Sequence, residues 1–341
     1  MSRKLSDIPF SILDLATIIQ GDDSATPAFR RSLDMARHAE RLGFKRYWFA
    51  EHHNMESVAS AATSVLVGYV AGGTTSIRVG SGGVMLPNHA PLVIAEQFGT
   101  LASLYPGRID LGLGRAPGTD PVTSYALRRS LNADVNEFPK DVVELIRYLG
   151  KRDASAKVHA IPGEETYVPV WLLGSSTFSA QLAGMLGLRF AFASHFAPAL
   201  LHDALNVYRN YFAPSETLDR PYAMACVNVV AADTNEEAEK LATSFYQLAL
   251  GIIRNDRHPL PPPVDNMDEI WSDREKMGVM QMTTYLFKGD RNNIQQSLQS
   301  FVDATGVDEL MMASHLFDHE KKKRSLEIIA GLSKIENQLS H

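Results

Sequence analysis

The feature that most constrains the fold is a regular alternation of short apolar segments with longer amphipathic ones. Eight short segments are typical of buried strands, and a helical pattern follows each of them. The strands begin near residues 10, 46, 77, 108, 168, 189, 222 and 307. Strict alternation with apolar strands indicates a parallel sheet covered by helices. Eight units in 341 residues favour a closed (β/α)8 TIM barrel over a doubly wound sheet.

We therefore predict a single TIM-barrel domain over residues 1–341 that carries two insertions. The first, near residues 151–167, is a polar excursion with a turn at Pro162-Gly163. The second, near residues 251–283, includes a proline-rich stretch, 254–278, that we expect to be irregular. Because long unstructured connections in compact domains are commonly functional, this second insertion is the candidate lid.

Polar residues and glycines gather where the predicted strands end. In TIM barrels the chemistry takes place at the carboxyl ends of the strands, so these clusters predict a site there. The clusters are Glu51-His52-His53, Gly82-Gly83, Gly114-Arg115, Gly174-Ser175-Ser176, His195 and His315.

The segment Gly174–Thr177 directly precedes a predicted helix and resembles an anion seat. Amide groups at a helix start, the positive end of the dipole and hydroxyl donors all suit a phosphate. The alternative is simple N-capping by serine or threonine. Arg115, at the end of another strand, favours the phosphate because arginine grips that group in a forked geometry. Gly112-x-Gly114-x-x-x-Gly118 has the wrong spacing for a dinucleotide fingerprint.

The histidines at the strand ends allow three interpretations. Glu51, His52 and His53 could bind a metal together with His195 and His315, since a catalytic metal takes about three protein ligands. No His-x-His pair or His-Glu-x-x-His helix supports a metal, so we predict none. One histidine could instead serve as an acid, a base or a hydrogen-bond donor to a substrate. A purely structural histidine is the third possibility.

Charge and cysteine content narrow the class of protein. With 33 Lys and Arg against 39 Asp and Glu, the net charge is −6, and no basic stripe suggests nucleic acid. The cation run Lys321–Arg324 is typical of a solvated helix face. The single cysteine, Cys226, excludes an internal disulfide and lies in an apolar segment that suits a buried thiol. No apolar run approaches the ~20 residues of a membrane span, so we expect a cytoplasmic protein.

Five segments share a pattern with a known family: Tyr47–His53, Arg78–Pro87, Pro91–Glu96, Pro106–Arg115 and Leu173–Ser176. Through these segments the chain resembles the bacterial luciferase-like flavin monooxygenases, and the resemblance covers nearly its whole length. This family has a TIM barrel, binds reduced FMN or in one branch a deazaflavin, and usually forms dimers through helices early in the barrel. The resemblance therefore implies a homodimer.

The resemblance also implies roles for particular residues. His52 matches the family's catalytic histidine beside the flavin, and Gly82-Gly83 matches a non-prolyl cis peptide under the isoalloxazine. The residues that match the phosphate clamp and its surroundings are Gly114, Arg115, Gly174, Ser175, Ser176 and Ser179. We place His53, His195 and His315 in the substrate pocket. The luciferase catalytic subunit has a cysteine where this chain has Gly114, which argues against light emission.

The implied reaction is a monooxygenation. Reduced FMN from a separate NAD(P)H-dependent flavin reductase would react with O2 to give a C4a-(hydro)peroxide that oxidises a small organic substrate. Two alternatives remain open: a deazaflavin-dependent oxidoreductase of the same fold, and a non-catalytic flavin-binding protein.

Overall fold

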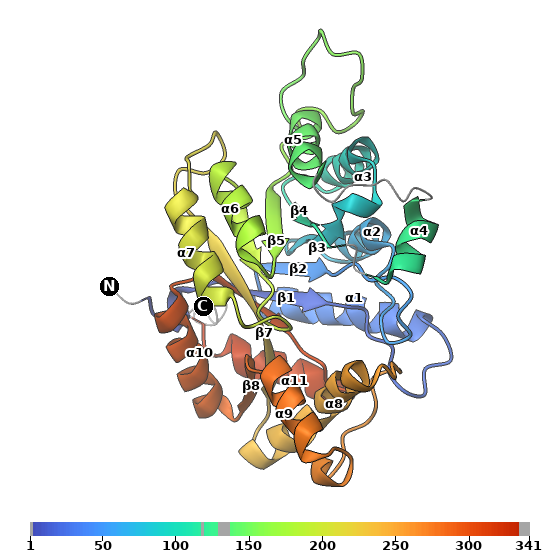
Figure 1. The fold of residues 1–341 in the computed structure, drawn as a ribbon, viewed down its shortest axis with the longest axis vertical. Helices are drawn as coiled ribbons and strands as arrows, with labels where there is room; N and C mark the ends of the chain where they lie inside the picture. The colour runs from blue at the N-terminus through green and yellow to red at the C-terminus, as the bar shows by residue number, and fades with distance from the viewer. Residues whose placement is uncertain (1–2, 117–118, 129–136, 334–341) are drawn as a thin grey trace.

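The backbone of the computed structural model, which describes residues 3–116, 119–128 and 137–333, closes into a parallel barrel (Figure 1). Neighbours around the ring are β1, β2, β3, β4, β5, β6, β7 and β9, and β9 pairs back onto β1. The ring strands are β1 (Phe10–Asp14), β2 (Arg46–Phe49), β3 (Arg78–Met85), β4 (Ile109–Gly114), β5 (Val170–Gly174), β6 (Arg189–Phe192), β7 (Ala223–Ala231) and β9 (Glu309–Ala313). The predicted (β/α)8 barrel is confirmed, with each strand within a few residues of its expected position.

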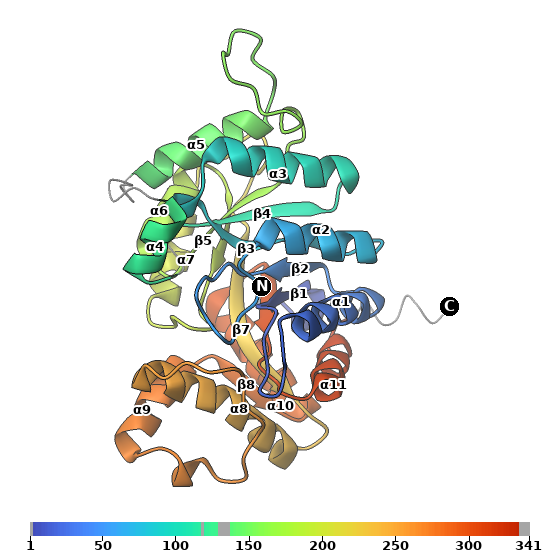
Figure 2. The ribbon, with the colours of Figure 1, turned by 90° about the vertical axis from the view of Figure 1, so that its right-hand side faces the viewer.

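Helices surround this ring and connect consecutive strands (Figures 1 and 2). They are α1 (Thr26–Arg41), α2 (Thr63–Gly73), α3 (Pro91–Leu104), α4 (Pro121–Arg128), α5 (Phe138–Leu149), α6 (Thr177–Met185), α7 (Leu201–Tyr211), α8 (Asn235–Arg254), α9 (Asp273–Met282), α10 (Arg291–Thr305) and α11 (His319–Ala330). None of the helices in the described part of the chain has both the length and the apolar character that crossing a membrane requires.

Strand β2 shows why the sequence forms a sheet that is buried on both faces. Tyr47 and Phe49 belong to the large core between barrel and helices, whereas Trp48 belongs to a second core inside the barrel. Successive strand residues point to opposite faces, so one apolar run supplies both cores. Inside the barrel, the rings of Trp48 and Trp171 meet edge to face with centroids 5.2 Å apart.

A buried ionic cluster fills the amino-terminal end of the barrel. Arg46 on β2 donates to both carboxylate oxygens of Glu309 on β9, at 2.7 and 3.1 Å. It also donates to Asp110 on β4 at 2.7 Å. The Glu309 and Asp110 side chains are 0% exposed and Arg46 is 6% exposed. The guanidinium of Arg46 lies 4.8 Å from the ring centroid of Trp171, so charges and aromatic rings together close this end.

The segment between β7 and β9 departs from the simple repeat. It holds α8, α9, the short strand β8 (Leu286–Gly289) and α10. β8 pairs with the second half of β7, whereas β6 pairs with the first half, so β8 is an addition to the ring. The expectation of an irregular chain over residues 254–278 is wrong from Asp273 onward, because α9 starts there. A capping box between Ser272 and Glu275 initiates that helix.

Helix α9 packs against α8 and forms a small core of its own at the lower end of the molecule in Figures 1 and 2. Val279 on α9 and Ala242 on α8 are both 0% exposed.

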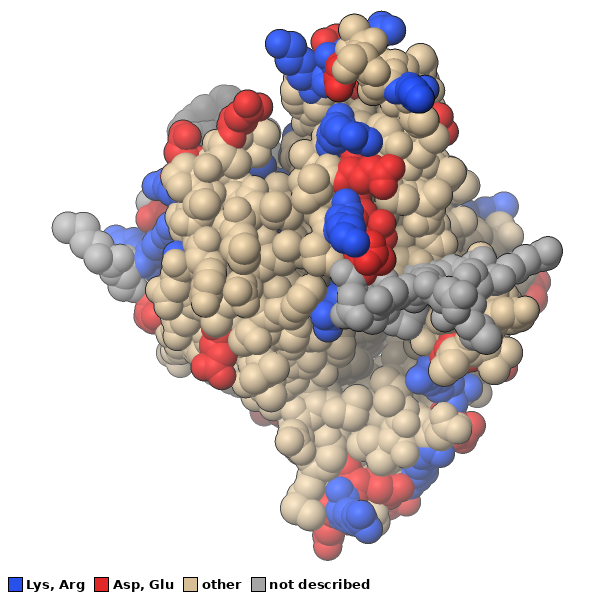
Figure 3. Space-filling model, turned by 45° about the horizontal axis from the view of Figure 1, so that its top comes forward, with Lys and Arg blue, Asp and Glu red and all other residues tan. Residues whose placement is uncertain are grey.

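By contrast, the connection between α5 and β5 contains no described helix or strand and projects beyond α5 at the top of Figure 1. On the face in Figure 3, Lys and Arg side chains are interspersed with Asp and Glu.

Candidate functional site

The structure brings Arg115 and the loop before α6 together at the carboxyl edge of the barrel. Arg115 follows the last residue of β4, and the loop follows the last residue of the neighbouring strand β5. The guanidinium carbon of Arg115 lies 4.2 Å from the ring centroid of Phe178, in the first turn of α6. Within the described chain, Arg115 has no carboxylate or other hydrogen-bond partner. A cation therefore stands beside a helix start.

The start of α6 is not capped by its own side chain. Ser176 is the N-cap residue, in an extended conformation (φ −142°, ψ 165°), but its hydroxyl accepts no amide hydrogen bond from the helix. The first amides of α6 therefore lack the usual internal acceptor. A Cβ on Gly174 would lie 2.5 Å from the Cβ of Ser179, so only glycine lets the loop fold so closely over the first turn. This loop and Arg115 have the donor set of an anion seat.

Glycines of β3 and β4 form an adjoining strip of bare backbone. The Gly82–Gly83 peptide bond is cis, as the resemblance implies, and the pairing of β3 with β4 shifts register between Ser81 and Val84. A Cβ on Gly83 would lie 2.7 Å from the carbonyl oxygen of Gly112. The close approach of the two strands is therefore enough to require glycine there, whatever lies above them.

A cavity of about 320 Å³ opens at the same edge of the barrel. Its volume is in the usual range for small-molecule sites. His52, His195 and His315 line it, from the segments that follow β2, β6 and β9. The walls are apolar and come mainly from α8 and the loop after β2: Met55, Val58, Phe245, Leu248, Ala249 and Ile252.

His195 is held in place from β7. Its carbonyl oxygen accepts a hydrogen bond from Asn228 Nδ2 at 2.6 Å, and the preceding residue, Ser194, donates to the carbonyl of Cys226 at 2.6 Å. Burial lowers the pKa of His195 to about 3, and the nearby imidazoles of His315 and His52 add to this effect. The imidazole is therefore neutral at physiological pH.

His315 is similarly neutral. Its ring stacks on Phe245 of α8, with centroids 4.6 Å apart and an interplanar angle of 8°. Burial lowers the pKa of His315 to about 4, and the positive charge of Lys322 contributes. The stacked pair joins the end of β9 to α8 and fixes one wall of the cavity.

His53 is not among the residues that line this cavity. Its Nε2 lies 3.0 Å from Oε1 of Glu51, and His89 Nε2 lies 2.8 Å from the same oxygen. Burial alone would raise the pKa of Glu51, but hydrogen bonds and charge from His89 and His53 lower it below its ordinary value. His89 was not among the predicted site residues, although this histidine also follows a predicted strand end, after Pro87.

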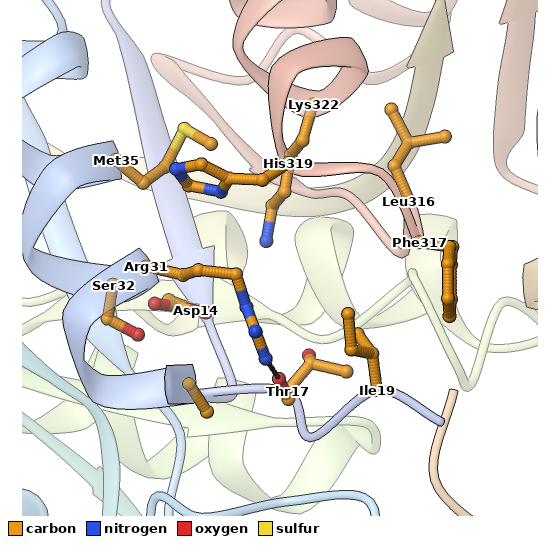
Figure 4. A pocket seen from close by; sticks show the side chains of 11 residues that line it. Asp14, Thr17, Ile19, Arg31, Ser32, Met35, Leu316, Phe317, His319 and Lys322 are labelled. Carbon is orange, nitrogen blue, oxygen red and sulfur yellow. Dashed lines mark hydrogen bonds between the residues drawn. The ribbon is translucent and has the colours of Figure 1, made fainter. Parts of the chain in front are cut away.

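Two other possibilities carry less weight. Within the described ranges, no group of three or more His, Cys, Asp or Glu side chains is arranged to hold a metal ion. A second hollow lies between α1 and the segment after β9 (Figure 4), but its volume is only about 20 Å³, space for one water molecule. Arg31, which lines it, is engaged by Asp22 and by the carbonyl oxygen of Thr17.

Known proteins resemble this chain in sequence and in fold. The family model described as luciferase-like monooxygenase matches residues 8–309. A luciferase-like monooxygenase of Escherichia coli K12 is 54% identical over 321 residues, which are 94% of this chain and 96% of the relative. The crystal structure of apo-MsnO8 has a TM-score of 0.86 at 30% identity and covers 95% of this chain and 98% of its own.

More distant matches have more specific descriptions. An N-acetyl-S-alkylcysteine monooxygenase of Bacillus subtilis is 29% identical over 95% of this chain and 97% of the relative. The oxygenating constituent of 3,6-diketocamphane monooxygenase from Pseudomonas putida, in complex with FMN, has a TM-score of 0.71 at 16% identity and covers 97% of each chain. An F420-dependent secondary alcohol dehydrogenase has a TM-score of 0.65 at 14% identity, and the match covers 96% of this chain and 98% of the dehydrogenase chain. The last two likenesses concern the fold alone.

Proposed function

Because the chain belongs to the luciferase-like monooxygenase family, we propose that it uses reduced FMN and O2 to oxidise a small organic substrate. A separate NAD(P)H-dependent flavin reductase would supply the reduced FMN. The observation that most strongly supports FMN is the position of Arg115 over the first turn of α6, beside an N-cap serine that does not cap its helix.

The residues at this edge fit the parts of FMN. Arg115, the first amides of α6 and the hydroxyls of Ser175 and Ser176 would hold the phosphate, and Ser179 would support the loop from the first helical turn. Gly82, Gly83 and Gly114 would give the flat ring system a surface without side chains. One arginine beside a helix start suits a cofactor with a single phosphate.

The protein's own residues would position the reactants and exclude water. When bound, reduced FMN would supply the two electrons with which O2 is split, one oxygen atom entering the substrate and the other leaving as water. His52 would hold or move a proton at the reacting atoms, because it lines the cavity at the end of β2. The apolar wall formed by α8 would keep bulk water away from them.

A spectroscopic titration tests this proposal. Purified protein is titrated with FMN, with reduced FMN under anaerobic conditions, and with the deazaflavin F420, while visible absorption is followed. We expect saturable binding of reduced FMN and no comparable affinity for F420. Preferential binding of F420 would support hydride transfer instead. Binding of reduced FMN without oxidation of any added substrate in air would support the non-catalytic alternative.

We also propose a homodimer formed through α2 and α3, as the resemblance implies. Val65 and Tyr69 on one face of α2 are 67% and 43% exposed, and Val93 on α3 is 44% exposed. Apolar side chains grouped on adjoining helices favour a protein interface. Light scattering after size exclusion should give twice the mass of the 37.6 kDa chain, and Val65→Asp should lower it. The cytoplasmic location stays a prediction.

A further inference from the structure

The two ring nitrogens of His195 have different surroundings. Nδ1 is buried and has no hydrogen-bond partner. The side chain nevertheless lines the cavity. Nε2 also has no hydrogen-bond partner in the described structure, but unlike Nδ1 it is not fully buried. Nε2 is therefore the nitrogen that a molecule in the cavity can reach.

This asymmetry decides the position of the proton. A neutral imidazole carries one proton, and its tautomer follows the hydrogen bonds that each nitrogen can make. A proton on Nδ1 would bury an N–H donor without an acceptor, which is costly. A proton on Nε2 can instead bond to a molecule in the cavity. His195 thus presents an N–H donor to the cavity, and the anchors from Asn228 and Ser194 fix its direction.

The rest of the cavity restricts what can meet this donor. The inner walls are aliphatic or aromatic, and four of the described lining residues are histidines: His52, His195, His258 and His315. His258 lies at the turn after α8, where its Nδ1 donates to the carbonyl oxygen of Pro259 at 2.9 Å. Asp256 and Arg257 also line it, but both are exposed, at the turn after α8, and they carry opposite charges on adjacent residues. A charged group inside would lose its hydration without a counter-charge, which strongly disfavours the binding of an ion there.

We propose that the cavity takes an uncharged, largely apolar substrate with one hydrogen-bond acceptor, and that the Nε2–H of His195 donates to this acceptor and orients the substrate beside His52. The identification of the cavity as the substrate site rests on the proposed function. The assignment of the donor rests on the contacts of His195 itself.

The tautomer can be measured without any substrate. Protein labelled with ¹⁵N-histidine gives imidazole ¹⁵N chemical shifts that distinguish the two neutral tautomers and the cation, and His195→Gln identifies the His195 signals. We expect the neutral Nε2–H form at pH 7. A Nδ1–H form or an imidazolium at that pH would overturn the proposal.

Ligand preference supplies the second measurement. Acetophenone and ethylbenzene have nearly the same shape, but only the ketone has an acceptor, and saturation-transfer NMR gives the dissociation constant of each. We expect His195→Phe to lower the affinity for acetophenone by about tenfold relative to that for ethylbenzene, which is the contribution of one hydrogen bond. His195→Gln, which keeps a donor amide, should retain most of the preference. The control His202→Gln, on the solvent face of α7, should retain all of it.

The outcomes separate this inference from the proposed function. If His195→Phe keeps the preference for the ketone, or lowers the affinity for both ligands equally, His195 does not orient the acceptor and the inference fails. If reduced FMN does not bind, the proposed function fails, while the tautomer and the ketone preference remain measurable. Thermal unfolding of each variant shows whether its fold is intact, and the tautomer measurement uses the unaltered protein.

Discussion

Replacing Arg115 with alanine should weaken FMN binding while leaving riboflavin binding nearly unchanged. Riboflavin is the same ring system and ribityl chain without the phosphate. Arg115 is placed over the first turn of α6 and forms no ion pair with another described residue, so its loss leaves no protein group unpaired. The substitution should therefore report on the ligand phosphate and only slightly on stability.

The magnitude follows from the contacts that the phosphate would lose. A hydrogen bond to a charged group contributes about 1.5–3 kcal/mol. At about 1.4 kcal/mol for each factor of ten, the dissociation constant of FMN should rise about 10- to 150-fold. The half-buried side chain and its fixed position on Phe178 favour the upper part of this range. Arg115→Lys keeps the charge but not the planar fork, so its effect should be intermediate.

Flavin fluorescence quenching measures both affinities on the same samples. The control is Arg220→Ala, which removes an exposed arginine from the loop before β7 and should leave FMN affinity unchanged. An equal loss for riboflavin and FMN would mean that Arg115 holds the ring or the loop and not the phosphate. Unchanged FMN affinity in Arg115→Ala would refute the assignment of the anion seat altogether.

Three further predictions concern other parts of the molecule. His52→Ala should depress turnover strongly while FMN affinity in the same titration survives; equal loss of both would assign His52 a structural role only. The pKa of His315 falls from 6.5 to about 4 on folding, so between these values the unfolded chain binds more protons and stability rises with pH. The free energy of unfolding, measured by urea denaturation, should therefore fall from pH 7 to pH 5. In His315→Gln this fall should be smaller than in the unaltered protein by about 2 kcal/mol, and an unchanged pH dependence would contradict this. Glu309→Ala should destabilise the protein by about 3–5 kcal/mol in urea unfolding, because Arg46 is left buried with one carboxylate fewer, whereas a loss under 1 kcal/mol would show that the cluster contributes little.

The barrel could be predicted from the sequence because its strands are buried on both faces. Runs such as Tyr47–Phe49 are continuous in apolar character and lie between helical patterns, so their number and order were visible. Helix α9 was missed because it buries little of its surface, and the prolines before it suggested an irregular chain. The pair Ser272 and Glu275 was the available signal, since a capping box marks a helix start. β8 was missed because its first three residues are only partly buried.

The candidate site could be predicted only where its residues directly follow a strand. Arg115 and Ser176 could be predicted to lie at the same edge because all parallel strands of a barrel end there. The direction of a side chain beyond a strand end depends on tertiary packing. The sequence therefore did not show that His53 and His89 both contact Glu51 while His52 lines the cavity. It also did not show the surroundings of each nitrogen of His195, because they depend on burial by distant segments.

The ionic cluster of Arg46, Asp110 and Glu309 affects the route by which small molecules enter and leave the cavity. In the described chain these buried side chains and Trp171 fill the amino-terminal end of the barrel, so we expect molecules to reach the cavity from the carboxyl edge. On the proposed function, substrate, O2 and product would then share one route, so a departing product would delay the next substrate molecule. Turnover should accordingly slow as product accumulates, even when the reaction itself cannot be reversed.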